Sequence, residues 1–505
     1  MVPLDRTSEF RVFKFFRKSL TDASQEEVRM SRETDDLELL DAKTTPEPEE
    51  DLEDLALGED YALNPEYVPM VVDALDRGDA ERLRDLLGAL HPADIADLMG
   101  FLSAGDREEL VPHLDPEALA EILSELDTEI REEVLEHVPS ATLAKALGEM
   151  ESDDAADVVD DLEDDKRAQV LAAMPDIERA AIETTLAYED ETAGRLMQRE
   201  VVAAPQFWTV GQTIDHLRRE SDDLPELFFD VYVVDPSYRP VGAAPVSHLL
   251  RAQRDTPLAQ IMEQITEIPV DMDQEEVAYI FDKYHLISAP VVEPGGRLVG
   301  QITVDDIVGV IQEETEEDIL ALAGVSDAGR DAGFLGIVRS RLPWLLLNLI
   351  TEAIAVIVIG PFQPMIAKIV VLVMLLPIVS SLGGNAGTQA LTVAVRAIAS
   401  KELNTHNAMR IIMRELSVGL INGAAVGLML GAGLFLWQHD WKLSLVVFLA
   451  IIANLFVAAL GGILAPIVLE RFGRDPAVSS SVVVTFMTDF FGFLALLGIA
   501  ALILL

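Results

Sequence analysis

The segment SVVVTFMTDFFGFLALLGIAALILL, residues 481–505, decides the fold class of the last third of the chain. Asp489 is its only ionisable residue, and about 20 predominantly apolar residues are enough for a helix that crosses a bilayer. Its apolar character begins near residue 477, and four similar stretches precede it, at about residues 342–362, 366–399, 416–437 and 443–469. Five such stretches in succession predict a five-helix membrane domain rather than a set of buried globular helices.

Asp489 is the residue of the fifth stretch that most needs an explanation. A lone charge inside a bilayer is costly, so an intramembrane carboxylate is by default a functional residue. Ser481, Thr485 and Asp489 recur every four residues and share one helix face. These oxygens suit a hydrated hard cation such as Mg²⁺, which sheds its water reluctantly. A proton relay would use the same Asp489, while Glu352 in the first stretch lies either on the same pathway or near the membrane interface.

The second stretch contains PIVSSLGGNAGTQ, residues 377–389. Pro377 and the pair Gly383-Gly384 are expected to loosen the helix around Asn385, which makes Asn385 a further candidate pore residue. Irregular backbone at membrane depth is tolerated only inside protein or along a water-filled cavity. A proline kink repaired by neighbouring helices is the alternative.

The third stretch has glycine at every fourth position, at Gly419, Gly423, Gly427 and Gly431. Such a face lets another helix approach closely. We therefore expect this stretch to serve packing rather than chemistry.

Charge is divided unevenly along the chain. The whole sequence has 87 acidic and 37 basic residues, whereas the part from Arg339 to Leu505 carries 10 Lys or Arg and 7 Asp or Glu. An acidic soluble part is thus followed by an apolar part, and its negative field repels nucleic acid and attracts cations. Because the chain has no cysteine, disulfides, thiol catalysis and thiolate metal sites are excluded.

Lys and Arg in the loops between the apolar stretches indicate the orientation, since they favour the cytoplasmic side. One side would carry only Lys368 and Lys442. The other would carry Arg339, Arg341, Arg396, Lys401, Arg410, Arg414, Arg471 and Arg474. We expect a multi-pass protein of the cytoplasmic (inner) membrane with a cytosolic N-terminal part and, because the number of spans is odd, an external C-terminus.

Residues 61–190 show a repeated helical pattern. HPADIADLM begins at His91, DPEALAEIL at Asp115 and PSATLAKAL at Pro139. Each proline stands near a helix start, where its missing N–H does no harm. The repeat predicts a small all-α superhelix of stacked helical hairpins. Residues 1–60 are acidic and unable to bury a core, and are expected to be a disordered acidic tail.

Residues 191–312 read as a duplicated α/β unit. DVYVVDPSYRPVGAAPVSHLL from Asp230 and SAPVVEPGGRLVGQITVDDIVGVI from Ser288 each contain a β run, a turn, a second β run and a helix. Each copy follows a helical segment, which predicts a tandem α/β module. An acidic helix comes next, and residues 313–338 would connect the module to a membrane domain over residues 339–505.

These parts, in this order, resemble the MgtE family of magnesium channels and transporters from about residue 66 to the end. The local motifs are YEDETAGRLM at 188–197, DQEEVA at 273–278, GRLVGQITVDD at 296–306, SLGGNAGTQ at 381–389, RDPA at 474–477 and TFMTDFFG at 485–492. The resemblance implies a multidomain integral membrane protein. Its parts would be an all-α superhelical N domain, α/β tandem cystathionine-β-synthase (CBS) domains, a connecting (plug) helix and a five-helix α transmembrane domain.

The same resemblance implies a homodimer whose pore lies between the subunits, with Asp489 matching the family's pore carboxylate. The family's cytosolic domains sense intracellular Mg²⁺ through acidic side chains and close the pore when Mg²⁺ is plentiful. The positions that match these sensing acids are Glu121, Asp153, Asp157, Asp273, Glu275, Asp306, Glu314, Glu317, Asp318 and Asp475.

Members of the family also bind ATP in CBS modules, whose nucleotide sites commonly read G-x-x-[ST]-x-x-D. The second module keeps Gly300, Thr303 and Asp306, so Thr303 and Asp306 are candidate nucleotide ligands, although we favour metal at Asp306. The first module reads GAAPVSH and departs from this pattern. His285 stands where a family member can have an acid, which would remove one ion site or make it pH-sensitive.

The sequence favours passive, Mg²⁺-gated entry of Mg²⁺, because an inside-negative potential drives a divalent ion inward without ATP. Mn²⁺, Co²⁺ and Ni²⁺ would also suit an oxygen-lined site. One alternative is a secondary transporter coupled to H⁺ or Na⁺ through Asp489, and another is a sensor whose membrane domain is only an anchor. No enzymatic activity is expected, because the soluble helices show no nucleophile beside a base, no HExxH and no glycine-rich phosphate loop.

Overall fold

The computed structural model describes residues 52–58, 61–221, 224–225, 227–325, 334–403, 407–472 and 480–504. The chain divides into two compact units, one ending at His113 and the other beginning at Leu114. Most of the expected acidic tail, residues 1–60, lies outside the described residues. Its last part is ordered, because Leu52–Ala56 form α2 and Ala56 is fully buried.

The first unit is helical in its described residues. Its further elements are α3 (Val68–Asp76), α4 (Ala80–Gly88), α5 (Pro92–Phe101), α6 (Ala104–Leu110) and the 3-10 turn η1 (Val111–His113). α5 begins where the repeat predicts a helix start, with His91 as its N-cap and Pro92 in its first turn. The buried Tyr67 donates its hydroxyl to the Leu86 carbonyl oxygen, which ties the start of α3 to α4.

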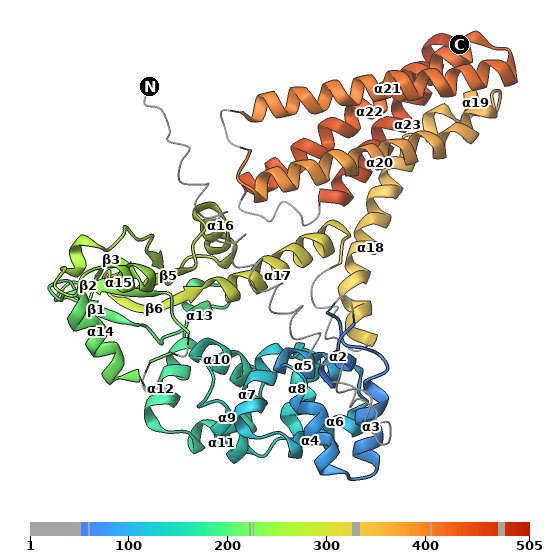
Figure 1. Ribbon diagram of the computed structural model, residues 1–505. Coiled ribbons are helices and arrows are strands. Elements are labelled where there is room, and N and C mark those ends of the chain that lie inside the picture. Colours follow the sequence, from blue (N-terminus) through green and yellow to red (C-terminus); the bar gives the residue numbers. More distant parts are fainter. Residues whose placement is uncertain are drawn as a thin grey trace, which may run out of the picture. The chain divides into compact units, whose positions relative to one another are not determined.

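The second unit opens with short helices. They are α7 (Pro116–Glu125), α8 (Thr128–His137), α9 (Ser140–Ala146), α10 (Ser152–Asp160), α11 (Asp164–Ala173) and α12 (Asp176–Thr185). α7 and α9 start at the other two repeat positions, with Asp115 and Pro139 as their N-caps. α7 packs on α9, α9 on α11, and α10 on both α7 and α12, as in stacked hairpins (Figure 1). The predicted helical repeat is confirmed.

Two small sheets of the same topology follow. The first contains β1 (Ala203–Pro205), β2 (Asp230–Val234) and β3 (Pro240–Pro245), and the second β4 (Ile268–Pro269), β5 (Ser288–Val292) and β6 (Leu298–Thr303). In each sheet the first strand pair is parallel and the second antiparallel, with a register shift at the corresponding place, Val233/Val234 and Val291/Val292. The accompanying helices are α14 (Val210–Arg219), α15 (Val246–Arg251), α16 (Gln274–Tyr284) and α17 (Val304–Leu322). The shared irregularity confirms the tandem module.

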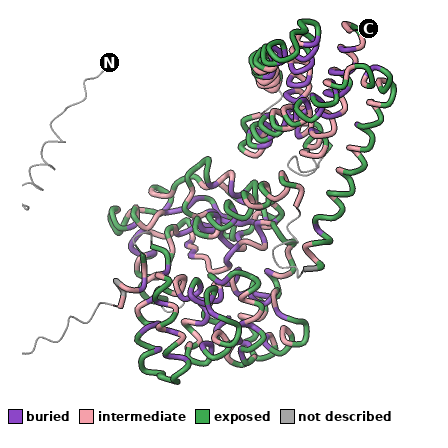
Figure 2. The backbone as a smooth tube through the Cα atoms, turned by 90° about the vertical axis from the view of Figure 1, so that its right-hand side faces the viewer, coloured by how far each residue is buried: buried purple, intermediate pink, exposed green. Residues whose placement is uncertain are grey.

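Long apolar helices make up the remainder of the second unit. They are α18 (Phe334–Ile357), α20 (Val371–Ala399), α21 (Ala408–Gln438), α22 (Trp441–Arg471) and α23 (Ser480–Leu504), with η5 (Gly360–Phe362) and α19 (Gln363–Ile366) after α18. Within the described residues, five helical segments are long and apolar enough to cross a membrane, which confirms the predicted membrane domain. α22 packs against α20, α21 and α23 and is the most buried of them. Figure 2 shows the buried positions inside this bundle.

α20 differs from the sequence-based expectation. It is a continuous helix from Val371 to Ala399 with Pro377 inside it, so the expected loosening around Asn385 is wrong. The glycines of this helix serve close packing instead. A Cβ atom at Gly387 would collide with the Val484 side chain of α23, and one at Gly462 of α22 would lie 2.5 Å from the Gly387 carbonyl oxygen. Neighbouring helices therefore pack closely on α20 at its glycines.

The glycine face of α21 meets α22, as predicted. Gly419, Gly423, Gly427 and Gly431 are all buried. A Cβ atom at Gly423 would lie 2.9 Å from the Cα atom of Ile452 on α22. The two backbones therefore approach as closely as a glycine face allows.

Candidate functional site

Asp489 lies inside α23 and is only 4% exposed. Its Oδ1 accepts a hydrogen bond from the hydroxyl of Ser380 on α20. The carboxyl of Glu352 on α18 is close enough to Asp489 for the two groups to interact. Three membrane helices thus bring oxygen-bearing side chains together at Asp489, and two of these groups are carboxyls.

In the described part of the chain, no hydrogen bond joins the other candidate pore residues to this group. Thr485 is half-buried, and its Oγ1 donates to the carbonyl oxygen of Ser481 at 2.9 Å, so this hydroxyl bonds within its own helix. Ser481 is also half-buried, whereas Asn385 is exposed on α20. The structure therefore bonds Asp489 to Ser380 and brings Glu352 near it, whereas Asn385 is exposed.

Sequence reasoning missed Ser380, although a signal was present. Ser380 stands one helical turn before Gly383, where side chains of two other helices approach α20 closely. A Cβ atom at Gly383 would lie 3.0 Å from Thr488 Cβ and would collide with the Asn454 amide. A serine one turn from a glycine contact is well placed to meet a polar group on the facing helix.

The side chain of Asn454 on α22 lies against Gly383 of α20 and Gly492 of α23. It is fully buried, and its Nδ2 donates to the Val379 carbonyl oxygen at 2.7 Å. Its Oδ1 has no hydrogen-bond partner among the described residues. A Cβ atom at Gly492, one turn beyond Asp489, would lie 2.8 Å from that Oδ1. Because an unmet buried acceptor costs about 1–3 kcal/mol, this oxygen marks a place for water or a ligand beside the Asp489 turn.

A first cluster of acids gathers at the starts of α10 and α17. Asp153 is 7% exposed, and in the described part of the chain its Oδ1 finds no hydrogen-bond partner. Burial raises the pKa of Asp153 well above its usual value, and the charge of Asp306 on α17 adds to the shift. Burial, followed by the same Asp306 charge, also raises the pKa of Asp154 and of Glu151 to about 7. At neutral pH this cluster therefore either holds protons or requires a cation.

Asp306 also belongs to the capping box of α17, whose N-cap is Thr303. Its Oδ2 accepts hydrogen bonds from Thr303 Oγ1 at 2.8 Å and from the Thr303 backbone N–H at 3.3 Å. Burial outweighs these bonds, so the pKa of Asp306 rises to about 6. The two candidate nucleotide ligands, Thr303 and Asp306, are thus bonded to each other.

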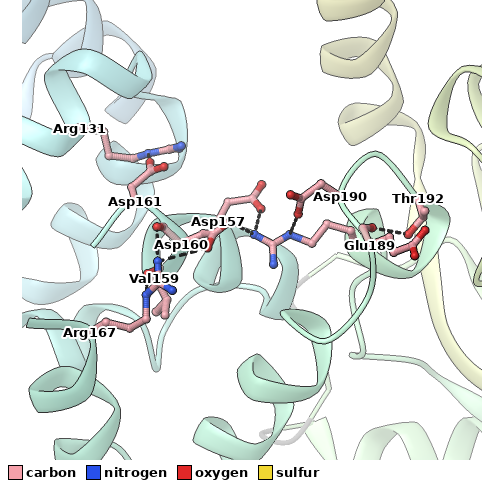
Figure 3. Close-up of polar contacts among 10 residues, drawn as sticks. Arg131, Asp157, Val159, Asp160, Asp161, Arg167, Glu189, Asp190 and Thr192 are labelled. Atoms are coloured by element: carbon pink, nitrogen blue, oxygen red, sulfur yellow. Dashed lines mark hydrogen bonds and ion pairs between the residues drawn. The ribbon is translucent and has the colours of Figure 1, made fainter. Parts of the chain in front are cut away.

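Asp157, also on α10, already has a cationic partner. Arg195 of α13 (Ala193–Leu196) places Nη2 3.3 Å from Asp157 Oδ1 and 3.0 Å from Asp160 Oδ2. Its Nε lies 3.9 Å from Asp190 Oδ1, and Figure 3 shows the Asp157 and Asp190 carboxylates turned toward this guanidinium. A cation that binds Asp157 would share it with Arg195.

A second cluster joins the start of α16 to the middle of α17. Asp273 caps α16 by accepting a hydrogen bond from the backbone N–H of Glu275 at 3.0 Å, and Gln274 Nε2 donates to Glu314 Oε1 of α17 at 2.7 Å. Burial raises the pKa of Glu275, and the charges of Glu314, Asp273 and Asp318 add to the shift in that order. Four expected sensing acids are therefore neighbours.

The remaining expected sensing acids are placed differently. Glu121 is exposed on α7 and Glu317 is exposed on α17, while Asp475 lies outside the described residues. His285 is exposed at the C-terminal end of α16, away from the acids that cap its start. In the ranges that the structure describes, no three His, Asp or Glu side chains converge closely enough to hold a metal ion. Each cluster brings carboxylates near one another, and carboxylate oxygens suit Mg²⁺. Neither cluster is a preformed coordination site.

Three parts of the chain match known families. Residues 376–499 match a family described as divalent cation transporter, residues 90–191 the MgtE intracellular N domain and residues 258–313 the CBS domain. The magnesium transporter MgtE of Enterococcus faecalis is 34% identical over 322 residues, which cover 64% of this chain and 71% of that protein. The chain belongs to the MgtE family. Another relative, the magnesium transporter MgtE of Thermus thermophilus, is 33% identical over 64% of this chain and 73% of its own length.

One solved structure similar to this MgtE family member is the cytosolic domain of the Mg²⁺ channel MgtE in complex with ATP. It is 34% identical, covers 48% of this chain and 99% of its own, and superposes with a TM-score of 0.46. The family match and the five candidate spans make the chain a multi-pass membrane protein. Its relatives are named as transporters rather than enzymes.

The matched stretches of this MgtE family member contain most of the site residues. Ser380 and Asp489 fall in the transporter match, Asp153 in the N-domain match and Asp306 in the CBS match. Glu352 falls outside all three. The α/β module around β1–β3 also falls outside them, although it repeats the topology of the matched module.

Proposed function

We propose that this chain mediates Mg²⁺ uptake across the cytoplasmic membrane as a passive, Mg²⁺-selective channel that intracellular Mg²⁺ closes. The observation that carries the proposal is the buried Asp489 of α23 with Ser380 of α20 bonded to it. An ionisable side chain at this depth marks an ion pathway by default. Relatives that share the surrounding sequence are named magnesium transporters.

The chemistry of Asp489 and Ser380 fits a hydrated ion. Mg²⁺ keeps several of its waters and binds through one or two carboxylates, so Asp489 would accept hydrogen bonds from water on the ion. The Ser380 hydroxyl stabilises the carboxylate between passages by donating to Oδ1. Inward movement of Mg²⁺ needs no ATP and no coupled ion. The membrane potential contributes about 2.3 kcal/mol per charge per 100 mV, and Mg²⁺ carries two charges.

We further propose a homodimer with its pore between the protomers, lined by α20 and α23. Exposed polar side chains in a membrane helix support this arrangement, since they are unfavourable against lipid. Asn385, Thr388 and Gln389 are all exposed on α20. In a dimer they would meet the partner or the pore, and Ser481 and Thr485 of α23 would join them. The Lys and Arg distribution in the loops supports a cytosolic N-terminal part and an external C-terminus.

The acidic clusters would supply the gate. The raised pKa values of Glu151, Asp153 and Asp154 mean that holding α10 against α17 is unfavourable when every carboxylate is charged. Mg²⁺ offsets that repulsion and favours the compact arrangement in proportion to its differential affinity. The unpartnered, buried Oδ1 of Asp153 is a ready oxygen ligand for such an ion.

α17 would transmit the signal, because it carries acids of both clusters. Asp306 lies in its first turn, and Glu314 and Asp318 follow along the same helix. In this account residues 61–190 and 191–312 are the sensing domains, residues 313–338 connect them to the membrane, and residues 339–505 form the pore domain. ATP binding through Thr303 and Asp306 would require both side chains to leave the bond that they make with each other.

Flux through the purified full-length protein in liposomes tests the proposal. Mg²⁺ entry is followed with a trapped indicator while valinomycin and K⁺ set the membrane potential. We expect net flux to reverse at the Mg²⁺ equilibrium potential, whether or not a pH or Na⁺ gradient is present. Stoichiometric H⁺ or Na⁺ movement would instead establish a secondary transporter, and an absence of Mg²⁺ flux would refute the proposal.

A further inference from the structure

Glu352 is an acid within the first membrane helix. It is the only acidic residue in the sequence of α18, which is the least buried of the candidate spans. Leu349 and Ile350 beside it are exposed, whereas Glu352 itself is half-buried. An acid in such a helix must find a partner, and the identity of the partner indicates its role.

The partner of Glu352 is Asp489. The two carboxyl groups are close enough to interact, and α18 packs against α23. Ala355, nearly one turn after Glu352, is fully buried in the core that α20, α22 and α23 share. The turn from Glu352 to Ala355 is therefore the part of α18 that meets the bundle, and it meets the bundle at the proposed ion pathway.

A purely structural contact is a poor explanation for this pair. Two carboxyls repel each other when both are charged, and an amide or a hydroxyl would make the same contact without that penalty. The fully buried Asn454 supplies an independent observation, since its Oδ1 faces the Gly492 turn next to Asp489 without a partner in the described residues. Oxygens of α18, α20, α22 and α23 are thus present around one place.

We propose that Glu352 is a second carboxylate of the ion pathway and binds the hydrated divalent cation together with Asp489. The inference rests on the proposed function, Mg²⁺ passage at Asp489. A second carboxylate beside Asp489 adds negative charge to the site and attracts a divalent ion more strongly than a monovalent one, so Glu352 contributes to selection by charge. Carboxylates that contact Mg²⁺ through its retained water suit such a site.

Cysteine labelling tests whether Glu352 lines a water-filled path. Because the chain has no cysteine, Glu352→Cys introduces a single thiol into the full-length protein. The probe is a positively charged, membrane-impermeant thiosulfonate, and the matched control is Leu349→Cys, three residues earlier on the exposed side of α18. We expect Glu352→Cys to react and Mg²⁺ at ten times its half-saturating concentration to slow the reaction about tenfold, whereas Leu349→Cys stays unmodified. An unreactive Glu352→Cys, or one that Mg²⁺ does not protect, would overturn the proposal.

Charge substitution tests the contribution to selectivity. In liposomes, Glu352→Gln keeps the size and hydrogen bonding of the side chain but removes its charge, and Glu352→Asp restores the charge. We expect Glu352→Gln to raise the half-saturating Mg²⁺ concentration roughly tenfold or more and to increase inhibition by Na⁺. Glu352→Asp should recover most of both properties. Glu470→Gln, an exposed acid near the end of α22, is the control and should match the wild type.

The outcomes separate this inference from the proposed function. If the wild type passes Mg²⁺, Asp489→Asn does not, and Glu352→Gln matches the wild type in half-saturation and Na⁺ inhibition, the inference fails and the proposed function stands. If the wild type passes no Mg²⁺, both fail. Should Glu352→Gln not give a monodisperse protein, the labelling of Glu352→Cys decides the question.

Discussion

The hydroxyl of Ser380 donates a hydrogen bond to Oδ1 of Asp489 and so joins two membrane helices, α20 and α23, across 109 residues of sequence. Asp489 is the only acid of α23. The Ser380 hydroxyl is therefore an uncharged hydrogen-bond donor to the one carboxylate of that helix. Because hydrogen bonds to charged groups contribute about 1.5–3 kcal/mol, Ser380 fixes the position of the carboxylate as well as stabilising it.

Removing this donor should impair transport. We expect Ser380→Ala to lower the Mg²⁺ flux about tenfold, in keeping with the loss of one charged hydrogen bond, and Ser380→Thr to retain most of it. Ser417→Ala is the control, because Ser417 is exposed on α21, which is not among the helices proposed to line the pore. Flux into liposomes at equal protein density provides the measurement. Equal flux in both alanine variants would mean that the Ser380 hydroxyl does not act on the pathway.

Removing acids along α17 should uncouple the gate from Mg²⁺. We expect the double variant Asp306→Ala with Glu317→Ala to continue passing Mg²⁺ when the Mg²⁺ concentration on the cytosolic side is high enough to close the wild type. Glu129→Ala with Glu132→Ala removes the same charge from exposed positions on α8 and should close normally. Full closure of the Asp306 and Glu317 variant would refute the sensing role of these acids.

Because of the first acidic cluster, around Glu151, Asp153 and Asp154, the effect of Mg²⁺ on protein stability should depend on pH. Burial raises the pKa of Glu151 from 4.5 and of Asp154 from 3.8, in both cases to about 7. Between about pH 4 and about pH 7 the folded state therefore binds more protons than the unfolded state. Without Mg²⁺, the stability of the folded state falls as the pH rises through this range. Since Mg²⁺ replaces those protons, it should raise the melting temperature of the full-length protein more at about pH 7.5 than at about pH 5.5. A Mg²⁺ effect that is equal at both pH values, or larger at the lower one, would contradict this assignment.

Replacing glycine by alanine should change the stability of the protein differently at two positions of α21. A Cβ atom at Gly423 would lie 2.9 Å from the backbone of Ile452, whereas one at Gly433 would meet nothing within 4 Å. We expect Gly423→Ala to destabilise the protein by about 1–3 kcal/mol through overpacking. Gly433→Ala should be neutral or stabilising by up to about 1 kcal/mol, because alanine favours the helix. Thermal unfolding in detergent measures both, and the same sign of change in both would contradict the close packing of α21 on α22.

Local sequence patterns predicted much of the fold. Helix starts at Pro92 and Pro116 follow from the restricted backbone of proline, and the duplicated β runs predicted two sheets of the same topology. The pairing of Asp489 with Ser380 and Glu352 was not predicted, because periodicity identifies a helix face but not the helix that it meets. Pro377 was misleading for a related reason, since the effect of a proline on a helix depends on the packing of its neighbours.

The role of Asp489 in Mg²⁺ passage is best tested by comparing Mg²⁺ flux through Asp489→Asn with flux through the wild type, in liposomes at equal protein density. Asparagine keeps the size of the side chain and an oxygen that can accept from Ser380, but it removes the charge. We expect clear Mg²⁺ entry with the wild type and, with Asp489→Asn, flux no greater than that of empty liposomes. Equal flux through the two proteins would mean that the Asp489 charge is not needed for Mg²⁺ passage.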